Sequence, residues 1–152
     1  MHTIIARLRA TPLGSAPGRL SVVAAYEDAS TDSRVNEFCR LLARQFGPKC
    51  QVSKQMWLLN ELRSPQLRAI AAGDAAGADL VIVAVHHAED LPGEVRDWVE
   101  LWVGRKKKRP SALVALFDQA YRGDSSRMRV YLADAAKRGH LEFLQQSDEA
   151  PE

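Results

Sequence analysis

Two histidines and two carboxylic acids stand close together in the middle of the chain, directly after an apolar run. They are His86, His87, Glu89 and Asp90. Imidazole and carboxylate groups can hold a polar ligand, bind a metal or transfer protons. Because neighbouring residues at a strand end point in opposite directions, one metal ion would rarely take both histidines, and we expect no metal site. A ligand-facing histidine and a histidine hydrogen-bonded within the fold are the two interpretations that remain.

Hydroxyl groups gather in a second polar segment, residues 27–33 (EDASTDS), which follows another apolar run. At the N-terminus of a helix, Ser30, Thr31 and Ser33 could bond a phosphate group, and Arg34 could neutralise it. The segment has no glycine that would let its backbone wrap an anion, and its carboxylates would repel one. Plain capping of the following helix by residues 30–33, which are good N-cap types, is the alternative interpretation.

A third polar segment, residues 118–124, carries Asp118 and Tyr121 and also follows an apolar run. None of the three segments places a serine or cysteine to form a catalytic triad with a histidine. We therefore name no catalytic residue and leave enzymatic activity open. If redox chemistry occurs, a bound cofactor would have to perform it.

The apolar runs that precede these segments are short and unbroken. Such runs indicate strands buried on both faces, as found in parallel sheets. They span residues 20–26, 80–85 and 112–117, and weaker strands are expected at 50–57 and 141–144. Helical patterns separate the strands, so the element order predicts an α/β fold. We expect a five-stranded parallel sheet of order 2-1-3-4-5, with helices on both faces, as a Rossmann-like three-layer α/β/α sandwich.

In that strand order, the carboxyl ends of the first, third and fourth strands meet above one crevice. Ligands of open α/β sheets bind at this edge. We therefore predict one binding site drawn from all three polar segments. Its predicted members are Ser30, Thr31, Ser33, Arg34, His86, His87, Asp90, Asp118 and Tyr121.

The length of 152 residues indicates one domain. We expect an N-terminal extension or linker at 1–19, in which residues 3–8 either add an edge strand or stay loose. The domain itself should span 20–146, followed by a disordered tail at 147–152. A hydrophobic fraction of 46% is sufficient for a core, and the net charge of only +2 argues against a uniformly basic nucleic-acid binder.

No apolar run approaches the ~18 residues that cross a membrane, and the apolar part of residues 1–10 is too short for a signal peptide. Cys39 and Cys50 lack the spacing of a metal site and are expected to be free thiols in a reducing compartment. We therefore expect a cytoplasmic protein. The basic run at 105–109 is expected to be a solvated loop.

The helix predicted after residue 92 has an apolar stripe at spacings of three and four, built from Val95, Trp98, Val99 and Trp102. Packing against the sheet explains such aromatic residues. Leu101 and Val103 widen the stripe, however, so part of this surface could meet a second subunit. We expect a homodimer that forms through the Trp98/Trp102 helix.

Residues 78–83 (ADLVIV) and 91–98 (LPGEVRDW) resemble the flavodoxin-like superfamily, especially its NADPH-dependent FMN reductases. That family has a strand that begins with Ala-Asp and a helix that begins with Pro-Gly. The resemblance implies FMN, held through its phosphate by residues 27–33 and around its ring by the other two polar segments. The chain departs from the family in these ligand segments, since the first is acidic and the second lacks the family's proline and aromatic residue.

The receiver domain of response regulators, which shares this topology, is a second resemblance. Glu27 and Asp28 resemble its acidic pair. The positions of its phosphoacceptor aspartate and its lysine are taken here by His86 and His87 and by Gln145 and Gln146. We therefore predict a small flavodoxin-like protein that binds FMN or another phosphate-bearing ligand. The alternative is a non-catalytic, degenerate receiver-like interaction domain that acts as a dimer.

Overall fold

The computed structural model describes residues 2–10, 18–86, 91–106, 110–117 and 126–145. Five strands form one sheet in the order β2-β1-β3-β4-β5, and every neighbouring pair is parallel. The strands are β1 (Arg19–Tyr26), β2 (Gln51–Leu58), β3 (Leu80–Ala84), β4 (Ala112–Leu116) and β5 (Glu142–Gln145). The predicted fold class and strand order are confirmed.

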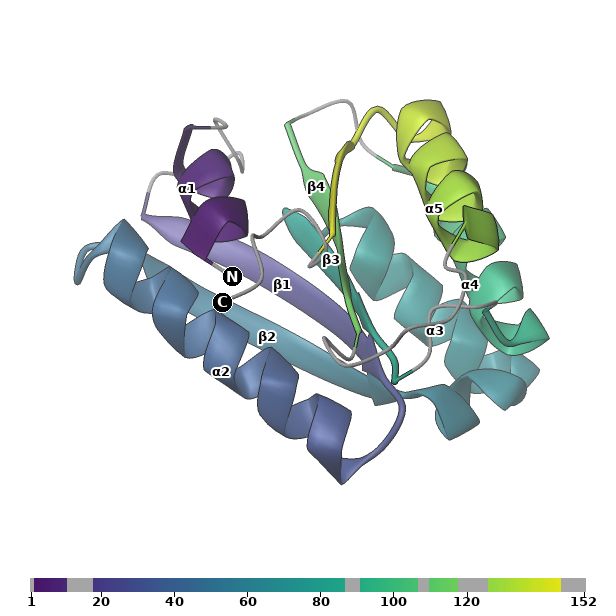
Figure 1. Cartoon of the computed structure of the whole chain (residues 1–152). Coiled ribbons are helices and arrows are strands. Elements are labelled where there is room, and N and C mark those ends of the chain that lie inside the picture. The colour runs from purple at the N-terminus through teal and green to yellow at the C-terminus, as the bar shows by residue number, and fades with distance from the viewer. Residues whose placement is uncertain (1, 11–17, 87–90, 107–109, 118–125, 146–152) are drawn as a thin grey trace.

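Helices cover both faces of this sheet (Figure 1). They are α1 (His2–Ala10), α2 (Ala29–Phe46), the 3-10 helix η1 (Leu59–Arg63), α3 (Pro65–Ala76), α4 (Gly93–Val103) and α5 (Ser126–Arg138). The chain moves from β1 to β2 in one direction across the sheet and in the other direction in every later connection. Right-handed crossovers therefore place α2 on one face and α3, α4 and α5 on the opposite face.

The central strands are buried on both sides, which explains their unbroken apolar sequences. All five residues of β3 and all five of β4 are buried. Val81 and Val83 pack in the layer that contains α3, α4 and α5, whereas Leu80 and Ile82 pack in the layer that contains α2. The sheet thus separates two hydrophobic cores.

The segment predicted as an edge strand or a loose extension forms the helix α1 instead. Ile4, Ile5 and Leu8 are at most 1% exposed and join the core on the α2 side of the sheet. Arg7 donates to Glu142 of β5 at 2.8 Å. The prediction for residues 3–8 was wrong because α2 alone leaves this face of a five-stranded sheet partly uncovered, and burying the three apolar side chains covers it.

Trp98 and Trp102 of α4 are both 0% exposed and pack edge to face, with ring centroids 5.9 Å apart. Both rings lie in the core between α4 and the sheet. They are therefore not available for the predicted subunit contact, and packing within the chain explains them. The homodimer itself stays a prediction that would need other residues of this helix. Among the described residues, no helix is long and apolar enough to cross a membrane.

An ion pair joins α5 to α4 at the surface. Arg138 donates to both carboxylate oxygens of Glu100, at 2.7 and 2.8 Å, and the Tyr131 hydroxyl donates to the same group at 2.6 Å. These hydrogen bonds, that from Arg138 first, lower the pKa of Glu100 to about 2. Since the folded-state pKa is depressed, this contribution to stability is present above the unfolded-state pKa and is lost as the pH falls toward 2.

We expect Glu100→Gln to lower the free energy of unfolding by about 1 kcal/mol at pH 7, a value kept small because the carboxylate is 48% exposed and screened by water. The difference from the wild-type chain should shrink between pH 5 and pH 3. Urea unfolding followed by circular dichroism at several pH values measures it. Glu94→Gln on the same helix is the control, and an equal, pH-dependent loss there would contradict the assignment.

Candidate functional site

The candidate site lies where β1 and β3 end side by side at the carboxyl edge of the sheet. Tyr26, the last residue of β1, pairs with Ala84, the last residue of β3. The chain then leaves β1 toward α2 on one face, whereas the connection from β3 leads to α4 on the other face. In folds of this class, ligands bind at such a switch point.

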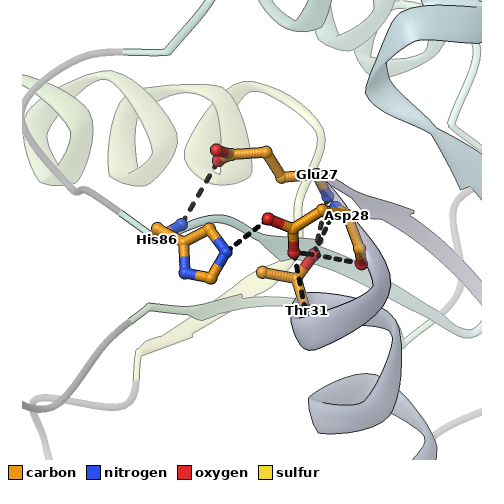
Figure 2. A network of polar contacts seen from close by, with 4 residues as sticks. All are labelled: Glu27, Asp28, Thr31 and His86. Atoms are coloured by element: carbon orange, nitrogen blue, oxygen red, sulfur yellow. Dashed lines mark hydrogen bonds and ion pairs between the residues drawn. The ribbon is translucent and has the colours of Figure 1, made fainter.

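Two carboxylates and one imidazole meet at this edge (Figure 2). His86 Nε2 lies 2.7 Å from Asp28 Oδ2, and the backbone N–H of His86 donates to Glu27 Oε1 at 3.3 Å. The side chain of His86 is 21% exposed and that of Asp28 is 49% exposed, so the group is open to solvent. The pairing of β1 with β3 brings these residues together although 58 positions separate Asp28 from His86 in the chain.

Asp28 is also the N-cap residue of α2. Its Oδ1 accepts a hydrogen bond from the backbone N–H of Thr31 at 3.1 Å, while Thr31 Oγ1 accepts from the backbone N–H groups of Glu27 and Asp28, at 2.8 and 2.9 Å. This reciprocal pattern is a capping box. The N–H of Thr31, followed by the imidazole of His86, holds the pKa of Asp28 below its usual value. The predicted cap at residues 30–33 was therefore placed too late in the chain.

The residues predicted to hold a phosphate all lie at the start of α2 and differ in their exposure. Thr31 is 0% exposed, and its hydroxyl is engaged in the cap. Ser30 and Ser33 are exposed in the first turns of α2, and Arg34 is half-buried on the same helix. Of the described members of the predicted site, only His86, which follows β3, lies outside α2. The predicted members His87, Asp90, Asp118 and Tyr121 lie outside the described residues.

Glu27 and Asp28 belong to the observed cluster but not to the predicted site. In the sequence they counted only as charges that would repel a phosphate or as a receiver-like acidic pair. The useful signal was their position: they follow β1 directly, as His86 follows β3, and the predicted strand order makes these strands neighbours. Neither carboxylate has a lysine or arginine as ion-pair partner in the described part of the chain.

A hollow of about 520 Å³ lies apart from this edge, between α4 and α5. Its lining residues are Arg96, Arg127, Val130, Tyr131 and Asp134. None of them belongs to the predicted site or to the Glu27–Asp28–His86 cluster. Nothing in the described structure indicates what would occupy this hollow, so the carboxyl edge remains the candidate site.

Comparisons with protein-family models and with curated proteins give no match. Among solved structures, the chain is similar to the solution structure of two-electron reduced Megasphaera elsdenii flavodoxin. The TM-score is 0.51 and the sequence identity is 12%, over 84% of this chain and 90% of that chain. At this identity the likeness concerns the fold alone, and the finer resemblance to FMN reductases is not shown. The chain therefore has a flavodoxin-like α/β fold.

Proposed function

We propose that this chain is a flavodoxin-like binding protein that holds a small ligand at the carboxyl edge of its sheet, above β1 and β3. The observation that supports this function is the meeting of Glu27 and Asp28 with His86 from the neighbouring strand, at the switch point of the sheet. Convergent polar groups from separate elements, at a switch point of this kind, are typical of ligand sites.

FMN is the first ligand to consider, because the sequence resemblance implies it and a flavodoxin is among the similar solved structures. A phosphate at the start of α2 would need free backbone N–H groups. Asp28 Oδ1 already accepts from the N–H of Thr31, and Thr31 Oγ1 accepts from the N–H groups of Glu27 and Asp28. Two exposed carboxylates add repulsion. These engaged N–H groups and the two carboxylates disfavour the phosphate of FMN at this position.

The same features favour a different class of ligand. Ionised carboxylates only accept hydrogen bonds, so two of them suit a ligand that brings a positive charge or several donors. His86 adds a ring nitrogen at 2.7 Å from Asp28, and its role as donor or acceptor depends on its tautomer. We infer that the ligand presents a cationic or donor-rich group to Glu27 and Asp28.

A nuclear magnetic resonance screen with matched cationic and anionic fragments tests the location and the charge preference together. Cationic fragments should shift the backbone amide signals of residues 26–32 and 84–86, and anionic fragments should not. The double variant Glu27→Gln/Asp28→Asn should lose these shifts, because asparagine still caps α2 but the charges are gone. Glu37→Gln, an exposed carboxylate further along α2, is the control. Shifts confined to the hollow between α4 and α5 would contradict the proposal.

Removal of the two charges should also change the response to FMN. We expect the wild-type chain to bind FMN more weakly than the double variant by about tenfold at low salt, because the two exposed carboxylates repel the phosphate. Riboflavin, which has the same ring and no phosphate, should bind both chains equally. Quenching of flavin fluorescence measures both ligands. Tight, phosphate-dependent binding of FMN to the wild-type chain would show that Glu27 and Asp28 do not repel the phosphate.

A further inference from the structure

We propose that Glu27, Asp28 and His86 bind a divalent transition-metal ion. This inference rests on the proposed binding function of the carboxyl edge and names the ligand class. Each of the three side chains offers one ligand atom, and these atoms all lie within 4.8 Å of one another. Two of the residues follow β1 and the third follows β3, so the group does not come from one stretch of acidic sequence.

The distances are close to those that coordination requires. A metal about 2.1 Å from each nitrogen and oxygen ligand places those atoms roughly 3 to 4.2 Å apart. Asp28 Oδ2 and His86 Nε2 are 2.7 Å apart and would have to separate slightly, whereas a carboxylate oxygen of Glu27 lies within 4.8 Å of both and would adjust to the ion. Glu27 is exposed and its Oε1 already contacts the backbone of His86, so rotation of its flexible side chain can supply this movement.

The surroundings hold the ligands in place and leave their charge unbalanced. The second carboxylate oxygen of Asp28, Oδ1, accepts a hydrogen bond from the backbone N–H of Thr31. Thr31 Oγ1 in turn accepts from the backbone N–H groups of Glu27 and Asp28. Such outer hydrogen bonds orient metal ligands. Since no lysine or arginine in the described chain pairs with Glu27 or Asp28, a bound cation would relieve their mutual repulsion.

The donor set selects the kind of metal. An imidazole nitrogen favours ions such as Zn²⁺, Co²⁺ and Ni²⁺ over Mg²⁺ and Ca²⁺, which prefer oxygen ligands only. Three protein ligands leave at least one coordination position open. Adjacent histidines such as His86 and His87 would rarely share one ion, but the proposed site uses only His86 of the two.

Calorimetric titration of the metal-free full chain with Zn²⁺ tests the proposal. We expect one Zn²⁺ per chain, bound at least tenfold more tightly than Mg²⁺. His86→Gln, Glu27→Gln and Asp28→Asn should each weaken Zn²⁺ binding tenfold or more, since even outer-shell changes cost 10–100-fold. Circular dichroism checks the fold of each variant. The matched control is His140→Asn, which removes an exposed imidazole at a positive φ of 60° that asparagine accepts.

Nuclear magnetic resonance with paramagnetic Co²⁺ locates the bound metal. Substoichiometric Co²⁺ should broaden the backbone amide signals of Glu27, Asp28 and His86 before any others. Failure of the wild-type chain to bind Zn²⁺, unchanged binding in His86→Gln, or loss of binding in His87→Asn alone would each overturn the metal assignment. If Zn²⁺ fails while cationic fragments still shift the amide signals at this edge, the metal inference falls and the proposed binding function stands.

Discussion

Replacing Trp98 with alanine should lower the free energy of unfolding by about 3–5 kcal/mol. The ring is 0% exposed and lies between α4 and the sheet, in the same core as Val81 and Val83. Its neighbour Trp102, one helical turn away, meets it edge to face. Removal of the ring takes away the largest kind of apolar side chain and leaves a cavity that these packed neighbours can only partly fill.

Urea unfolding followed by circular dichroism measures this loss without relying on tryptophan fluorescence. Trp98→Phe should cost clearly less than the alanine variant, because a ring remains and because the indole N–H has no hydrogen-bond partner among the described residues. Val130→Ala, at a side chain 67% exposed on α5, should change stability by less than about 0.5 kcal/mol.

The same experiment addresses the predicted dimer. If Trp98 stabilised the protein through a subunit interface, the effect of its removal would depend on protein concentration. Burial within one chain predicts no such dependence. A loss below about 1 kcal/mol for Trp98→Ala, or a loss that disappears on dilution, would contradict the packing described for α4.

Asp79→Ala should have the second-largest effect, a loss of about 1.5–3 kcal/mol in the free energy of unfolding. Asp79 is 6% exposed at the amino end of β3, and its Oδ2 accepts from the backbone N–H of Ser21 at 2.8 Å. Its own backbone N–H donates to Ser21 O at 2.9 Å, and its carbonyl accepts from the N–H of Ala112 at 3.1 Å. Alanine keeps the backbone contacts but leaves the N–H of Ser21 without its carboxylate acceptor.

Asparagine provides the matched comparison for Asp79, because its amide oxygen can accept the same hydrogen bond from Ser21. We expect Asp79→Asn to retain most of the stability that the alanine variant loses. Urea unfolding of both variants at neutral pH measures the difference in stability between Asp79→Asn and Asp79→Ala. Equal losses in the two variants would show that the hydrogen bond to Ser21 is not the source of the effect.

Much of the sheet could be predicted because its strands carry strong local signals. The unbroken apolar residues of β3 and β4 permit few structures other than buried strands, and handedness then restricts the strand order. The start of α3 also carries strong local signals, since Ser64 caps the helix and Pro65 occupies its first position. Local chemistry alone determines such features.

The failures have a common physical origin in contacts between distant segments. The nine-residue segment that forms α1 is too short for the spacing of Ile4, Ile5 and Leu8 to distinguish a helix from a strand. The choice depends on the uncovered face of the sheet against which these side chains pack. The cap at Asp28 was missed because four successive residues after it could serve equally well. The cluster with His86 was missed because a phosphate was assumed as the ligand, which made two carboxylates an objection.

The contact between Arg7 and Glu142 has a consequence for synthesis of the protein. The two residues are 135 positions apart, so α1 emerges from the ribosome long before its partner in β5 is translated. Until then Ile4, Ile5 and Leu8 lack part of the surface that buries them. Exposed apolar stripes on nascent chains are aggregation-prone. The packing of α1 on this face of the sheet can therefore be completed only after β5 has been translated.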